Sequence, residues 1–192
     1  MRNFFSQLSK PFSYLFIKGI GGKAVYDWIA PFFLTLFSLG YFYLFNISEK
    51  TIIEDGGVIK TIASFISNLP GFYIAALAAI ATFNREQIDH PLINDKGSPS
   101  IDVRVTKENG HVVNTTEPLT RRLFLCMLFA YLTALSIFII IMNAFISPLL
   151  KIYSENLFPA IYIALFLFLS WQMLISTFFS LYYLGNRIHL NY

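Results

Sequence analysis

Charge is what this sequence lacks most. Charged residues make up 13% of the 192 residues, whereas soluble domains of ordinary composition carry about 25%. Hydrophobic residues make up 56%, and the mean hydropathy is +0.59. The composition therefore excludes an ordinary soluble domain and predicts a membrane protein.

Cysteine is nearly absent as well. The single Cys126 excludes an intrachain disulfide and a cysteine-based metal cluster. Cys126 lies in an apolar run, so we expect a buried, unreactive thiol. The net charge of +3 is too small to indicate direct nucleic-acid binding.

Catalytic signatures are missing too. The chain has no nucleophile–base set, no paired carboxylates within its apolar runs, and no flavin or nucleotide fingerprint. "GIGGKA" at 19–24 lacks the spacing of a phosphate-binding loop and has Ala24 where a hydroxyl is needed. We interpret it as a flexible hinge, and we expect a protein that is not an enzyme and holds no cofactor or metal.

Long apolar runs are what the chain does have. Each of four runs exceeds or approaches the about 20 residues that a helix needs to cross about 30 Å of hydrocarbon. None contains Asp, Glu, Lys, Arg or His. The fold class predicted is an all-α membrane protein, one domain over 1–192, with transmembrane helices at about 28–46, 62–83, 123–146 and 157–184.

Basic residues are distributed unevenly between the segments that connect these runs. Eleven of the fourteen Lys and Arg lie in the N-terminal segment, the loop 84–122 and the tail, and the others are Lys50, Lys60 and Lys151. Because cytoplasmic segments carry an excess of Lys and Arg, both termini and the loop 84–122 are expected in the cytoplasm.

The first 18 residues are amphipathic. Phe5, Leu8, Phe12 and Leu15 recur at spacings of three and four. This pattern predicts an N-terminal amphipathic helix in the cytoplasmic interface, in contact with membrane lipids. A frayed terminus is the alternative.

Small residues form a row on the second span. Gly71, Ala75 and Ala79 recur at steps of four, which favours close helix packing against a neighbouring span or a second copy. Pro70 is expected to kink this helix.

Polar residues form one face of the fourth span, at Gln172, Ser176 and Ser180. Helix–helix packing and homo-oligomer formation are one interpretation, since polar side chains hydrogen-bond across helices in lipid. A pore lined by this face and by Asn68 is the other. Coupled ion transport is disfavoured, because no ionisable residue is placed within the predicted spans.

The loop 84–122 is too long for a simple connection between helices, which usually takes two to eight residues. Ile101, Val103 and Val105 alternate with polar residues, which is the period of a strand, and Asn109-Gly110 follows as a turn signal. We expect a small cytoplasmic β-hairpin. With a two-residue turn, its facing pairs would be Val105 with Asn114, Thr106 with Val113, and Lys107 with Val112.

Charges gather around this hairpin, and they are predicted to contact a soluble partner. The second span is expected to extend into the cytoplasm until Pro91, and Thr120 to cap the third span. The candidate partner-binding residues are Arg85, Glu86, Asp89, His90, Asp102, Arg104, Lys107, Arg121 and Arg122.

A metal site is an alternative for part of this set. Glu86, Asp89 and His90 share one helical face, and His111 lies in the hairpin. No metal-binding fingerprint accompanies them. We therefore prefer a contact surface.

In topology, the chain resembles the membrane subunit of the Kiwa anti-phage defence system. The shared features are the basic amphipathic start, four spans, and an ordered cytoplasmic loop between spans two and three. No residue role is transferred. The resemblance implies a bacterial inner-membrane protein that oligomerises, senses phage-related membrane disturbance, and recruits a cytoplasmic DNA-binding partner.

The leading hypothesis is therefore an oligomeric membrane sensor or scaffold that recruits or regulates a cytoplasmic effector through the central loop. A pore-forming effector and a membrane-bound metal-dependent enzyme are the alternatives.

Overall fold

The computed structural model describes residues 7, 9–17, 19–82, 89–92, 99–106, 112–152 and 157–187. Side chains are described for all of these except 101–106, 112–117, 151–152 and 186–187. The elements are a 3₁₀-helix η1 (Lys10–Phe16), a π-helical turn η2 (Val25–Ile29), helices α2 (Ala30–Leu44), α3 (Glu49–Ile53), α4 (Val58–Ile66) and α5 (Leu69–Thr82), strands β1 (Ser100–Thr106) and β2 (Val112–Pro118), helices α7 (Arg121–Ile152) and α8 (Phe158–Tyr182), and a π-helical turn η3 (Tyr183–Arg187).

Among the described residues, four helical segments are long and apolar enough to cross a membrane, as predicted, which makes this a multi-pass membrane protein. They are Val25–Leu44, Glu49–Thr82, Arg121–Leu150 and Phe158–Gly185. The first begins earlier than the predicted Trp28 and includes Asp27. The expectation that no ionisable residue lies within the spans is therefore wrong.

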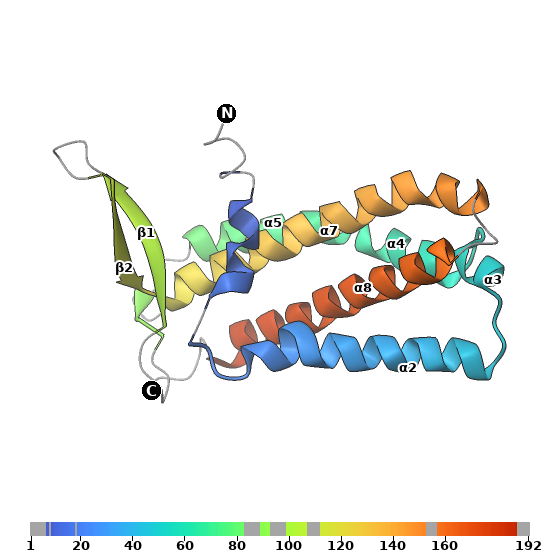
Figure 1. Ribbon diagram of the computed structural model, residues 1–192. Helices are drawn as coiled ribbons and strands as arrows, with labels where there is room; N and C mark the ends of the chain where they lie inside the picture. Colours follow the sequence, from blue (N-terminus) through green and yellow to red (C-terminus); the bar gives the residue numbers. More distant parts are fainter. Residues whose placement is uncertain are drawn as a thin grey trace.

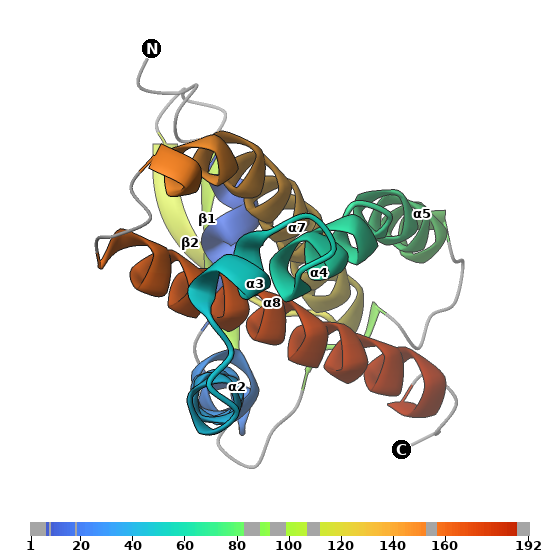
Figure 2. The same ribbon diagram turned by 90° about the vertical axis from the view of Figure 1, so that its right-hand side faces the viewer.

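The helices form a row rather than a closed bundle. The main contacts run from α2 to α8, from α8 to α7, and from α7 to α5, and Figure 2 places α2 and α5 at opposite sides of the α7–α8 pair. Side-chain hydrogen bonds join neighbours where lipid gives no hydrophobic drive for association. Trp171 Nε1 donates to Ser38 Oγ at 3.0 Å, and the hydroxyls of Tyr73 and Thr177 lie 2.6 Å apart.

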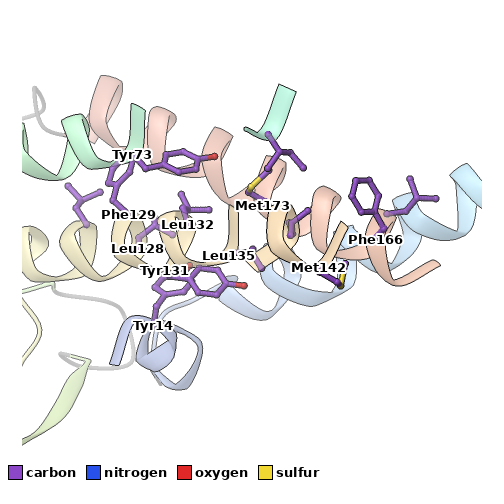
Figure 3. Close-up of a cluster of buried hydrophobic side chains, with 14 of the residues drawn as sticks. Tyr14, Tyr73, Leu128, Phe129, Tyr131, Leu132, Leu135, Met142, Phe166 and Met173 are labelled. Atoms are coloured by element: carbon purple, nitrogen blue, oxygen red, sulfur yellow. The ribbon is translucent and has the colours of Figure 1, made fainter. Parts of the chain in front are cut away.

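Helix α7 is the centre of the core. Its Leu128, Phe129 and Leu132 are fully buried. Tyr73 of α5 packs against one side of α7 and Tyr14 of η1 against another (Figure 3). By contrast α2 buries few side chains and exposes Phe32, Phe33 and Phe37, among others, as expected of a lipid-facing helix.

The N-terminal segment differs from the predicted interfacial helix in its described part. A seven-residue 3₁₀-helix begins at Lys10, with Pro11 in its first turn. Figure 1 shows it lying across the start of α7. Tyr14 is fully buried, whereas Phe16 is 78% exposed. Aromatic stacking on α7 decides this placement, since Tyr14 lies with its ring centroid 5.2 Å from that of Tyr131.

The second span breaks where a kink is predicted. Helix α4 ends before Ser67, and α5 begins at Leu69 with Pro70 in its first turn. Proline has no N–H to donate to the preceding turn, so the helix restarts there instead of bending. Asn68 at the break donates its side-chain amide to Ser64 O at 3.1 Å.

The predicted small-residue row is not packed against the described neighbouring spans. Gly71, Ala75 and Ala79 are exposed on α5, while Tyr73 and Ile80 of the same helix are buried against the core. A Cβ atom at Gly71 would meet nothing within 4 Å. A neighbouring span is therefore not its partner.

Strands β1 and β2 pair antiparallel in the segment for which a hairpin is predicted. The predicted register is wrong. Arg104 lies opposite Asn114, Val105 opposite Val113, and Thr106 opposite Val112. Thr106 and Val112 are separated by the five positions 107–111, an odd number that a two-residue turn cannot accommodate. The strands therefore meet one residue out of the expected alignment.

Candidate functional site

The base of the β1–β2 pair is fastened to the transmembrane helices. We define this hairpin base as residues 89–92, 99 and 119–122. Leu119 is fully buried. Its backbone atoms join the two ends of the loop, so the base of the strands is held by the membrane domain. The contacts are the hydrogen bonds Leu92 N to Leu119 O (2.8 Å), Leu119 N to Pro99 O (2.8 Å) and Arg121 N to His90 O (3.2 Å), and a bridge between Pro91 and Thr120.

Arg122 closes the hairpin base. Its Nε and Nη2 donate to the two carboxylate oxygens of Asp89 at 2.7 and 2.9 Å, a bidentate ion pair. Its Nη1 donates to Ile80 O and Ala81 O at 3.4 and 3.2 Å. Both carbonyls belong to the last described turn of α5. Arg122 and Asp89 thus make an internal contact, and their contact with a partner stays a prediction.

Thr120 caps α7 as predicted, since its Oγ1 accepts a hydrogen bond from Leu123 N at 3.2 Å. Asp89 is helical and His90 is not, as expected from the position of Pro91. His90 is exposed, and Arg121 is partly exposed. Both belong to the hairpin base, where Arg121 N donates to His90 O.

The other predicted partner-binding residues are divided between β1 and the segments outside the described residues. Asp102 and Arg104 lie in β1, opposite Thr116 and Asn114. Arg85, Glu86 and Lys107 lie outside the described residues, as does His111 of the alternative metal set. Both carboxylate oxygens of Asp89, the described acid of that set, are bound by Arg122.

A second polar cluster joins η1 to the start of the first span. We name Tyr14, Lys23 and Asp27 the N-terminal lock. Lys23 Nζ lies 2.6 Å from Asp27 Oδ2, donates to Leu15 O at 3.2 Å, and lies 4.5 Å from the centre of the Tyr14 ring. The Tyr14 hydroxyl donates to Asp27 Oδ1 at 3.2 Å. Every charge in the lock thus has a partner, as burial requires.

The lock is buried. The side chains of Lys23 and Asp27 are 9% and 1% exposed. Burial, with the nearby Asp27 carboxylate, raises the pKa of the Tyr14 hydroxyl, so Tyr14 stays a neutral donor at physiological pH. Asp27 lies in the π-helical turn η2, and single π-turns are frequent at functional sites.

Sequence reasoning missed this lock. Lys23 and Asp27 are four residues apart, the spacing of an ion pair on one helical face. That spacing is the signal that could have found it. The hinge interpretation of "GIGGKA" is only partly right. Gly19 and Gly22 have φ of 89° and 78°, a conformation suited to glycine, but Lys23 already belongs to the helix.

The polar face of α8 lies inside the chain. Gln172, Ser176 and Ser180 are all buried. Gln172 Nε2 donates to the backbone oxygen of Asp27 at 2.8 Å, which joins α8 to η2. Ser180 Oγ donates to Thr177 O of its own helix at 2.7 Å, and Ser176 Oγ has no hydrogen-bond partner among the described residues. Asn68, the fourth residue of the pore hypothesis, is also bonded to its own helix.

Comparison with known proteins adds no relative: no family model, no curated protein and no solved structure matches this chain.

Proposed function

We propose that this chain is a non-enzymatic, oligomeric scaffold or sensor of the bacterial inner membrane that presents its β1–β2 hairpin to a cytoplasmic effector. One observation carries the proposal. The loop between α5 and α7 is bonded across its base and tied to both helices through Arg122. A rigidly held hairpin can transmit a change in the spans to a bound protein, whereas a free linker cannot.

The cytoplasmic position of the hairpin follows from the distribution of Lys and Arg. In Figure 1 the strands, η1 and the start of α2 lie at one end of the helices, and α3 lies at the other. That arrangement fits a common side for the N-terminal segment and the hairpin.

Homo-oligomer formation is supported by the exposed row of Gly71, Ala75 and Ala79. Small residues allow the close backbone approach that joins helices in lipid. The topological resemblance to the Kiwa membrane subunit agrees with an oligomer and with a DNA-binding cytoplasmic partner in anti-phage defence.

Photo-crosslinking in cells tests the effector proposal. A photoreactive amino acid is placed at Asp102 or Arg104 in β1, and, as matched controls, at Lys50 or Glu54 at the opposite end of the helices. We expect a specific soluble protein to be crosslinked from β1 and not from the controls. Identical adducts from both ends, or none from β1, would reject the effector role.

A leucine substitution tests the oligomer. Gly71 and Gly40 are both helical glycines with nothing within 4 Å of an added Cβ. Gly71→Leu should shift native mass spectra in detergent toward the monomer, because the row can no longer approach a second copy. Gly40→Leu on α2 should leave the mass unchanged. Equal spectra for the two variants would exclude this row as the interface.

A further inference from the structure

We propose that the N-terminal segment is a regulatory strap that sets the rigidity of the hairpin base. The strap comprises η1 and Gly19–Lys23. The proposal rests on the hairpin being the effector-binding element, and it adds the means by which that element is controlled. One contact connects the strap to Phe124 in the first turn of α7, a second connects it to Pro99 of the hairpin base, and the N-terminal lock holds the strap in place.

The first contact is made by Tyr14 on the first turns of α7. The Tyr14 ring lies 5.9 Å from the ring of Phe124, which is two residues after Arg122, the residue that binds Asp89 and the end of α5. The hydroxyl of Tyr14 faces Asp27. A single buried side chain thus joins the lock to the turn of α7 that fastens the hairpin.

The second contact is made by Gly19 on Pro99. A Cβ atom at Gly19 would lie 3.5 Å from both Cα and Cβ of Pro99. Pro99 immediately precedes β1, and its carbonyl accepts the Leu119 N–H. The strap therefore lies directly against the point where the chain enters the hairpin.

The lock fixes the end of the strap, where the chain turns through two glycines of positive φ. Gly19 and Gly22 flank the turn that leads to Lys23. Lys23 Nζ binds both Leu15 O, in the strap, and Asp27, in the first span. Movement of the first span is thereby coupled to the strap. A packed contact that has two arrangements, docked and released, is the physical basis of such coupling.

Hydrogen exchange of the full chain in lipid nanodiscs tests the strap, with residue-level readout at Leu92, Leu119 and Arg121. The N–H groups of these three residues donate the backbone hydrogen bonds that close the hairpin base. Tyr14→Ala should raise their exchange rates about tenfold, within the usual range of coupling between sites. Phe16→Ala is the matched control, because Phe16 lies in the same helix but is 78% exposed. It should leave the three rates unchanged.

Gly19→Val is the second variant. A β-branched residue does not adopt a φ of 89°, so the strap must leave Pro99. It should raise the same three rates. The exchange rates of the α8 amides report whether the whole protein stays folded. If these amides lose their protection in Tyr14→Ala, the exchange rates of Gly19→Val alone test the strap.

Faster exchange confined to Lys10–Phe16, or equal rates in Tyr14→Ala and Phe16→Ala, would overturn the strap. No partner is needed for this measurement. Its failure would leave the photo-crosslinking result untouched, and loss of the crosslink would leave the exchange result untouched.

Discussion

Replacing Lys23 by methionine should destabilise the protein far more than an ordinary loss of an ion pair. Methionine keeps the unbranched stem but removes the ammonium group, which lies 2.6 Å from Asp27 Oδ2. The Asp27 side chain, 1% exposed, would then remain buried with the Tyr14 hydroxyl as its remaining side-chain donor among the described residues. Leu15 O would also lose the Lys23 donor.

The expected magnitude follows from burial. Removing one partner of a buried ion pair costs about 3–5 kcal/mol of unfolding free energy, because the other charge stays buried and uncompensated. The ion pair of Lys60 with Asp55 is the control, since those side chains are 34% and 82% exposed. Lys60→Met should cost at most about 1 kcal/mol.

Reversible unfolding in mixed detergent and sodium dodecyl sulfate micelles measures both variants. The double substitution Lys23→Met with Asp27→Leu should recover most of the loss, since an apolar pair of similar volume often replaces a buried ion pair without cost. The reasoning is refuted if Lys23→Met costs no more than Lys60→Met, or if the double variant is less stable than Lys23→Met alone.

Three further predictions concern contacts at the other side chains described above. Asp89→Asn should cost about 0.2–1 kcal/mol, since Asp89 is 57% exposed, and should speed hydrogen exchange of the Arg121 amide; unchanged exchange would show that the ion pair does not hold the base. Tyr73→Phe should cost about 0.5–1.5 kcal/mol in the same unfolding assay, because the Thr177 hydroxyl keeps its bond to Met173 O; a cost above about 3 kcal/mol would contradict that compensation. Burial raises the pKa of Tyr14, so the folded chain retains this proton at pH values where the unfolded chain, with a tyrosine pKa of about 10, releases it. The stability of the wild type relative to Tyr14→Phe should thus be constant from about pH 6 to 9 and fall from about pH 9 to 11; a difference that changes below about pH 8 would contradict the assignment.

The spans were the easiest feature to predict. A helix must satisfy its own backbone in lipid, so a long apolar run has few other structures open to it. Their ends were harder. The first span begins before Trp28 because Asp27 has a buried partner in Lys23, and a sequence window shows the charge without showing the partner.

The candidate site was predictable only in part. Thr120 is a cap by local rules, and the alternation of Ile101, Val103 and Val105 predicts a strand, because both depend on neighbours in sequence. The partner of Arg122 depends on how α5 and α7 meet. Charged residues near a membrane can bind lipid, another protein or each other, and the sequence does not distinguish these.

The amino-acid sequence alone determined that the chain is a membrane protein with four apolar helices, since length and hydropathy depend only on the order of residues. Tertiary structure alone decided which polar residues are internal. It brought both Gln172 and Tyr14 to Asp27. It also left Gly71 and its row exposed. The reason is physical: a buried polar group must find its hydrogen-bond partner, and in these pairs the partner lies on another element, far along the chain or across a turn.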